Sequence, residues 1–156
     1  MRSEIKKNVI AFVFFCVGCL VLILVNFFIL RVAVDTQNTT MEKVLQESLD
    51  KINKNNYTVD RMLPIHSPIF SSARIFLISV NDEIPGPAYA LVLNASGMAG
   101  QVPLIFIHTK AKGLFFAGIY AVDESFDDIE KYGITPAILK TYKHKAATII
   151  TEFSEK

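Results

Sequence analysis

The hydrophobic residues of this chain are concentrated in one long run near the N-terminus. Residues 9–30 contain no charged side chain, and Asn26 is the only strongly polar residue among them. At a rise of about 1.5 Å per residue, a helix of this length spans the ~30 Å hydrocarbon core of a bilayer. The pattern therefore predicts one transmembrane helix over residues 9–30.

A cleaved secretory signal is the main alternative for this segment. The apolar region of such a signal is usually only ~7–15 residues long and ends at small residues. This run is longer, and four bulky residues at positions 27–30 close it. Residues 17–19 loosely resemble the site before a lipidated cysteine, but the apolar run continues through Leu30. We therefore expect an uncleaved membrane anchor.

The basic residues near the run predict its orientation. Three of them lie within the first seven positions, whereas Arg31 is followed by no other basic residue until Lys43. Positively charged residues favour the cytoplasmic side of a membrane helix. We therefore expect residues 1–8 to form a cytoplasmic tail and the chain from about residue 34 onward to lie outside.

Helical spacing returns over residues 39–54, where apolar residues occupy one face and charged residues the other. The Thr-Thr-Met-Glu motif at residues 39–42 fits a capping box and predicts that a second helix starts there. This amphipathic helix could pack on its own domain, lie on lipid or dock on a partner. We interpret residues 31–70 as a linker that contains it.

Four runs rich in β-branched, leucine and aromatic residues follow, separated by short turn segments that contain glycine, proline or asparagine. Such short connections join antiparallel neighbours. The runs predict an antiparallel meander of about four strands. These strands are expected over residues 74–80, 88–95, 102–109 and 114–122.

Two helices are expected after the strands, at residues 125–132 and 136–153. Thr135 and Pro136 suit the cap and the first turn of the longer helix. The order of elements predicts an α+β domain over residues 71–156, with a small antiparallel sheet covered on one side by the C-terminal helices.

The candidate catalytic groups of this domain are few. Both cysteines, Cys16 and Cys19, lie in the apolar run, and the three histidines, at positions 66, 108 and 144, have no ligand-like spacing. Asp123 and its acidic neighbours suit a helix start, with metal binding as a weaker alternative. We predict no catalytic residue and no metal site. The formal net charge of +1 also gives no support for a nucleic-acid partner.

The most distinctive local feature is a pair of glycines three positions apart, Gly97 and Gly100, directly before an apolar strand. Glycine permits backbone conformations and close approaches that a Cβ atom would forbid. The pair predicts a tight turn, with or without a ligand above it.

These features together resemble the FMN-binding-domain family of RnfG and NqrC, single-pass subunits of ion-pumping electron-transport complexes in bacterial inner membranes. The resemblance covers residues 9–122. It includes the Val25-Asn26 pair at the end of the apolar run, the Leu63-Pro64 segment, and Gly97 and Gly100 as the glycines of a Gly-Tyr-x-Gly motif. Gly113 would be the turn glycine that follows.

The resemblance implies an extracytoplasmic subunit that relays electrons through FMN and contacts both the lipid bilayer and multi-pass membrane subunits. Gly97 and Gly100 would then lie at the cofactor. The family bears its flavin on the threonine of a Ser-Gly-Ala-Thr motif, and the nearest match here is Thr148, which lacks the serine and the glycine. We therefore expect any FMN to be bound non-covalently, in a version of the domain that lacks the covalent-flavin motif.

A second departure from the family lies at residues 123–126, where Asp-Glu-Ser-Phe stands in place of Glu-Thr-Pro-Gly. The alternative to the electron-transport role is a stand-alone anchored binding or sensor domain, or an envelope assembly module, that carries no cofactor. Any enzymatic role would be electron transfer at most, since no hydrolytic or transferase site is visible.

Overall fold

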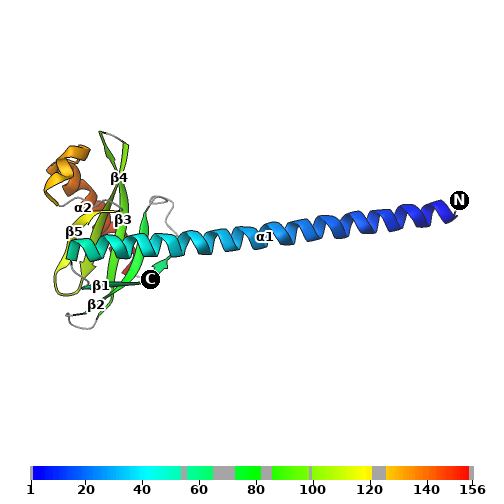
Figure 1. Cartoon of the computed structure of the whole chain (residues 1–156), viewed down its shortest axis with the longest axis horizontal. Helices are drawn as coiled ribbons and strands as arrows, with labels where there is room; N and C mark the ends of the chain where they lie inside the picture. Colours follow the sequence, from blue (N-terminus) through cyan, green and yellow to red (C-terminus); the bar gives the residue numbers. More distant parts are fainter. Residues whose placement is uncertain are drawn as a thin grey trace. The chain divides into compact units, whose positions relative to one another are not determined.

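One continuous helix, α1 (Arg2–Asn53), begins the chain (Figure 1). The computed structural model describes residues 2–53, 56–64, 73–81, 86–98, 100–120 and 126–154, with only the backbone at residues 2–11, 53, 126–128 and 154. The chain divides into two compact units, Met1–Thr39 and Thr40–Lys156, and each is considered by itself.

The predicted helix start at Thr39 is wrong, because α1 continues through it. The Thr39 hydroxyl donates to the Asp35 carbonyl at 2.9 Å, and the Thr36 hydroxyl donates to the Val32 carbonyl at 2.8 Å. Both are bonds to the preceding turn of the same helix, so Thr39 does not cap a new one. Residues 31–40 contain neither glycine nor proline, and nothing there breaks the helix.

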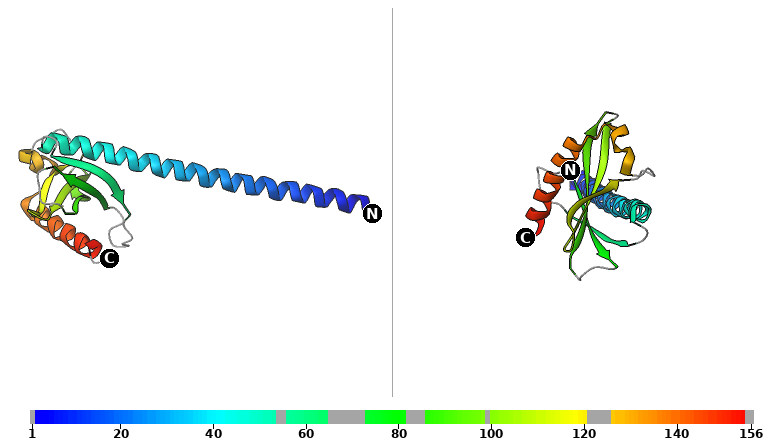
Figure 2. Two further views of the ribbon diagram at one scale, coloured as in Figure 1. Left: turned by 90° about the horizontal axis from the view of Figure 1, so that it is seen from below. Right: turned by 90° about the vertical axis from the view of Figure 1, so that its left-hand side faces the viewer.

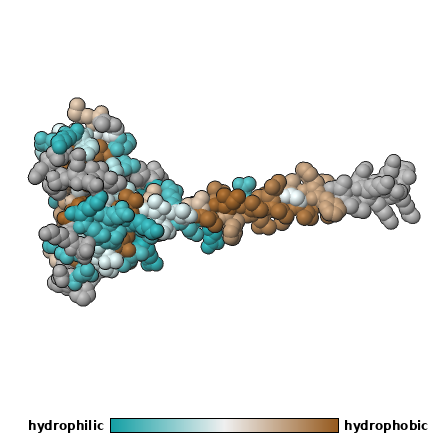
Figure 3. All heavy atoms as spheres, in the orientation of Figure 1, coloured by the Kyte–Doolittle hydropathy of each residue, from teal (hydrophilic) through white to brown (hydrophobic). Residues whose placement is uncertain are grey.

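The first unit presents an apolar surface. Every side chain from Phe12 to Gln37 is exposed, and Figure 3 shows the apolar colouring along this part of α1. Among the described residues, α1 is the one helix long and apolar enough to cross a membrane, and none of its apolar window is buried. This helix is a candidate membrane anchor.

The second unit contains an antiparallel sheet whose five strands are hydrogen-bonded in chain order. The α+β prediction is confirmed, with five strands in place of four. The strands are β1 (Tyr57–Leu63), β2 (Arg74–Val80), β3 (Ala88–Gly97), β4 (Gly100–Thr109) and β5 (Gly113–Ile119).

The additional strand, β1, lies in the segment that we interpreted as a linker. It is half polar, and its pairing with β2 shifts register between Val59 and Arg61. A bulge breaks the alternation of apolar and polar positions on which strand recognition depends. The sequence signal for β1 was therefore weak.

Both faces of the sheet are buried, which corrects the expectation of a sheet covered on one side. Helix α2 (Pro136–Ser154) packs on one face through Ala146 and Ile149. The last turns of α1 pack on the other face through Leu45 and Leu49, which are almost completely buried. Figure 2 shows the sheet between the two helices. The amphipathic end of α1 is thus part of the domain core.

The C-terminal elements follow the predicted order. The predicted short helix is present as a 3₁₀ helix, η2 (Phe126–Tyr132), and it is followed by Gly133, which has a φ of +74°. Helix α2 begins at Pro136 as predicted, and the hydroxyl of Thr135 accepts a hydrogen bond from the Ile138 amide at 3.4 Å.

Candidate functional site

A pocket of about 250 Å³ lies at one end of the sheet. Its lining residues are contributed by four strands or their ends and by the beginning of the α1 segment that packs on the sheet. Those within the described part of the chain are Met41, Arg74, Phe76, Val92, Asn94, Pro103 and Tyr120.

The strand register places the pocket on the face that α1 covers. Arg74 lies opposite Val92, and Asn94 lies opposite Pro103. Directly opposed residues of antiparallel strands share a face of the sheet. Phe76 and Val92 belong to the same core cluster as Leu45 and Leu49 of α1. The pocket therefore continues this hydrophobic core towards the surface.

Tyr120 connects two walls of the pocket. Its hydroxyl donates to the Met41 carbonyl at 3.2 Å, and its backbone amide donates to the Pro103 carbonyl at 2.9 Å. Burial raises the pKa of the Tyr120 phenol above its ordinary value of 10.0, so the side chain is neutral at physiological pH. Tyr120 thus holds α1 against the end of the sheet without adding a charge.

Among the described residues that line the pocket, Arg74 is the one with a charged side chain. It is half-buried at the first position of β2, and its guanidinium donates to the Ala73 carbonyl at 2.9 Å. Asn94 lies diagonally across from it on β3 and is exposed. The pocket thus has apolar walls with a cation and an amide among them, an arrangement typical of small-molecule sites.

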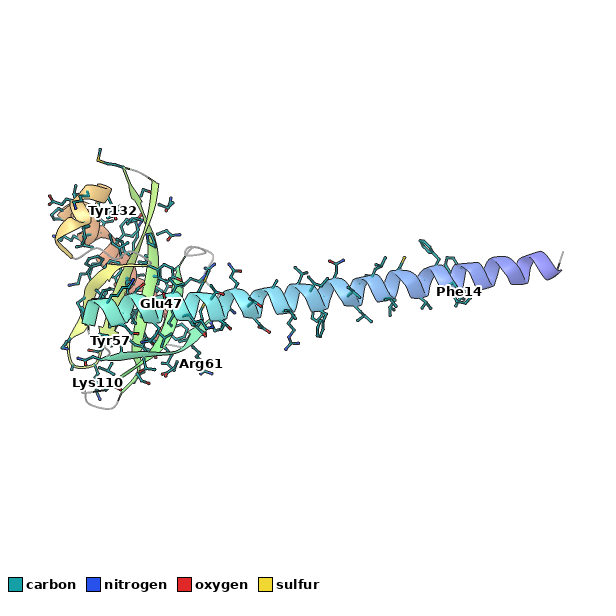
Figure 4. The ribbon with its side chains drawn as sticks, in the orientation of Figure 1. Phe14, Glu47, Tyr57, Arg61, Lys110 and Tyr132 are labelled. Carbon is teal, nitrogen blue, oxygen red and sulfur yellow. The ribbon has the colours of Figure 1, made fainter. Side chains whose placement is uncertain are left out.

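Gly97 and Gly100, which we predicted as cofactor-binding residues, pair across the two-residue turn between β3 and β4. A Cβ atom on Gly97 would collide with the Tyr132 carbonyl and lie 2.8 Å from a Val102 methyl group. The Met98 amide donates to the same Tyr132 carbonyl at 3.1 Å. Close packing of the hairpin on the end of η2, near the labelled Tyr132 of Figure 4, therefore explains Gly97.

Thr148, the third predicted residue, lies on the exposed surface of α2, where its hydroxyl donates to the His144 carbonyl at 3.2 Å. The glycine hairpin contacts Tyr132 and Gly133, just before α2 begins. Thr148 is twelve positions after Pro136, which is about 18 Å along the helix. The structure does not bring the three predicted residues together, and none of them lines the pocket.

The remaining candidates from the sequence are dispersed. Asp123, Glu124 and His66 lie outside the described residues. Among the residues that are described, no three His, Cys, Asp or Glu side chains form a group that could hold a metal ion.

The Nδ1 atom of His108 is buried on β4 without a hydrogen-bond partner in the described part of the chain. Gly113 takes a positive φ of 66° in the β4–β5 turn, as its predicted turn role requires.

The pocket residues were missed from the sequence because they share no local motif. Met41 and Tyr120 are 79 positions apart. The one available signal was a polar residue, Arg74 or Asn94, at a position of its strand that shares a face with apolar residues. That signal does not specify which other residues line the same pocket.

A protein-family model described as "Uncharacterised protein" matches residues 36–156. No curated protein matches the chain, and no solved structure matches it.

Proposed function

We propose that this chain, which belongs to the family matched over residues 36–156, is a single-pass membrane-anchored binding protein. The observation that carries the proposal is the pocket at the α1-covered end of the sheet. Sites for small ligands are concave and largely apolar, with a few convergent polar groups. Arg74, Asn94 and Tyr120 are polar groups of that kind.

The anchor supports the same proposal. The exposed apolar part of α1 suits a bilayer, and the three basic residues before it favour an N-terminus inside the cell. The folded unit is then on the extracytoplasmic side, and the bacterial inner membrane is the membrane that we propose. Ten residues separate Leu30 from Met41 in the chain, so the anchor and the folded unit are joined by a short connection.

A scaffold with two covered faces suits binding. Residues on regular elements hold a site more precisely than residues on loops do. Five of the seven lining residues that the structure describes lie on strands β2, β3 and β4, and Met41 lies on α1. Such a pocket can take a ligand without large rearrangement.

The electron-transport role implied by the resemblance to RnfG and NqrC is the competing proposal. It requires FMN, and it predicts co-purification with multi-pass membrane subunits. The close packing at Gly97 and the helical hydrogen bond of Thr148 have explanations without a cofactor. The geometry therefore favours the binding protein.

The test uses full-length protein purified in detergent from its native membranes. We expect an organic extract of the wild type to contain a small molecule at near-stoichiometric amount by mass spectrometry, and the protein to be colourless. Asn94→Trp, which places an indole at the pocket rim, should lose that molecule.

Ser96→Trp is the matched control, because Ser96 is exposed two positions further along β3 and does not line the pocket. It should retain the molecule. A wild type that holds nothing, or equal retention by both tryptophan variants, would contradict the pocket as the binding site. A yellow protein that co-purifies with multi-pass subunits would establish the electron-transport role instead.

A further inference from the structure

We infer that α1 pairs with the α1 helix of a second copy of this chain inside the bilayer, through hydrogen bonds between the two Asn26 side chains. This inference rests on the membrane anchor of the proposed function and is independent of the pocket. The polarity of Asn26, its depth along the helix and the size of its neighbours lead to it separately.

Asn26 is a polar side chain in an apolar environment. It is the one strongly polar residue among residues 9–30, its side chain is exposed on α1, and none of the described residues is hydrogen-bonded to it. The Thr36 hydroxyl, by contrast, donates to the Val32 carbonyl of its own helix. A polar group in hydrocarbon is costly unless it is hydrogen-bonded, and membrane helices meet this need through a neighbouring helix. Asn26 therefore requires a partner outside its own helix.

The depth of Asn26 prevents water and lipid headgroups from serving as that partner. Asn26 lies five positions before Arg31, the first charged residue after the apolar run. At a rise of about 1.5 Å per residue, this is about 7 Å along the helix, inside the hydrocarbon core. Long lysine and arginine side chains can reach the interface from such a depth. The asparagine side chain is too short to do so.

A second copy of the chain is a partner that matches this side chain. An amide has both N–H donors and a carbonyl acceptor, so two asparagines can bond to each other. Copies of one chain cross the membrane in the same direction, so their helices run parallel and Asn26 can meet Asn26 across a two-fold axis. One asparagine in the seam between paired helices also fixes their register.

The side chains one heptad away on the same face of α1 are small. Cys19 precedes Asn26 by seven positions, and Ala33 follows it by seven. Seven residues are about two helical turns, so these three exposed side chains form a line along the helix. Small side chains let two membrane helices approach closely. Close approach brings the short Asn26 amides within hydrogen-bonding distance of each other.

Cysteine crosslinking in native membranes tests the inference, because the two natural cysteines lie at different positions around the helix. Cys19 is about 20° from Asn26 around α1, whereas Cys16 is about 80° from it. Full-length Cys16→Ala retains only Cys19 and should form a disulfide-linked dimer on oxidation with copper phenanthroline. Full-length Cys19→Ala retains only Cys16 and is the matched control, which should form several-fold less dimer.

Substitutions of Asn26 in the Cys16→Ala protein show whether the amide holds the pair. Asn26→Leu should increase the dissociation constant of the dimer at least about fivefold, measured by energy transfer between labelled full-length chains in lipid vesicles. Asn26→Gln keeps an amide and should retain most of the pairing. The double variant Leu24→Asn/Asn26→Leu keeps the composition but moves the amide about 160° around the helix, so it should lose the Cys19 crosslink.

Alkaline extraction of the same membranes separates this inference from the proposed function. A chain that stays in the membrane but crosslinks equally through both cysteines, or crosslinks regardless of Asn26→Leu, would overturn the pairing and leave the anchor intact. A Cys19 crosslink to a different protein would also overturn it, because the partner would not be a second copy. Release of the chain by alkali would contradict the anchor itself and the pairing with it.

Discussion

The side-chain amide of Gln46 donates to the backbone carbonyl of Tyr57 at 2.9 Å, and its oxygen accepts the backbone amide of Val59 at 2.7 Å. Gln46 thus bonds to the edge strand β1 as a neighbouring strand would. Unpaired strand edges promote aggregation, and natural proteins cover them. Gln46 therefore bonds the helix to the edge strand, as Glu42 does when its Oε1 atom accepts the Met62 amide at 2.8 Å, and the two residues protect that edge.

Gln46→Ala should destabilise the folded unit by about 1–3 kcal/mol, because it leaves two part-buried backbone groups without their partner. Thermal unfolding of the full-length protein measures this loss. Hydrogen exchange should become faster at the Val59 amide in particular. Gln37→Ala is the control on the same helix, where the side chain is exposed. An unchanged exchange rate at Val59 would contradict the role of Gln46.

Tyr120→Phe should make the protein less sensitive to alkaline pH. The raised pKa means that the folded state keeps the phenolic proton after the unfolded state has lost it. Stability is therefore fully present below a pH of about 10 and decreases as the pH rises towards the folded-state pKa. The unfolding midpoints of wild type and variant should converge as the pH increases above about 10. A difference that stays constant with pH would show that ionisation of Tyr120 is not coupled to unfolding.

Gly97→Ala should destabilise the protein by about 1–3 kcal/mol, because the new methyl group collides with the Tyr132 carbonyl and crowds Val102. The adjacent exposed position provides the control, and Ser96→Ala should stay within about 0.5 kcal/mol of the wild type. Denaturant unfolding distinguishes the two. Equal stability of the variants would show that the hairpin moves away from η2 at little cost.

Thr148→Ala should leave both stability and absorbance unchanged. The hydroxyl is exposed and bonds only to its own helix among the described contacts, so its removal costs no more than about 0.5 kcal/mol. The neighbouring Ile149 is buried, and Ile149→Ala should cost about 2–5 kcal/mol. Loss of a chromophore from acid-precipitated Thr148→Ala protein, present in the wild type, would identify Thr148 as a flavin attachment site.

The elements that were predictable from the sequence are those with strong local signals. Strand β2 has the predicted bounds, Arg74 to Val80, because its mostly apolar sequence, interrupted only by Ser79 after Arg74, ends before the turn at Asn81. Helix α2 begins at Pro136 because its cap and first turn have the expected residues. Such signals depend only on neighbours in the chain.

The features that were missed depend on contacts between distant segments. Thr39 fits a capping box, but the absence of a helix breaker was decisive, and α1 continues. The second covered face depends on Leu45 and Leu49 meeting a sheet that begins later in the chain. The pocket could not be foreseen, because Arg74 and Tyr120 come to line the same pocket only after the strands have paired.

The chain-order pairing of the strands affects how the unit folds. Each strand pairs with the one made just before it, and the β3–β4 and β4–β5 turns are short, so the sheet can grow by adding hairpins. Loop closure of this kind costs little entropy and favours rapid folding. The bond between Tyr120 and Met41 closes a loop of 79 positions and needs the completed sheet. The pocket should therefore be the last part of the unit to form, and only a correctly completed sheet would contain it.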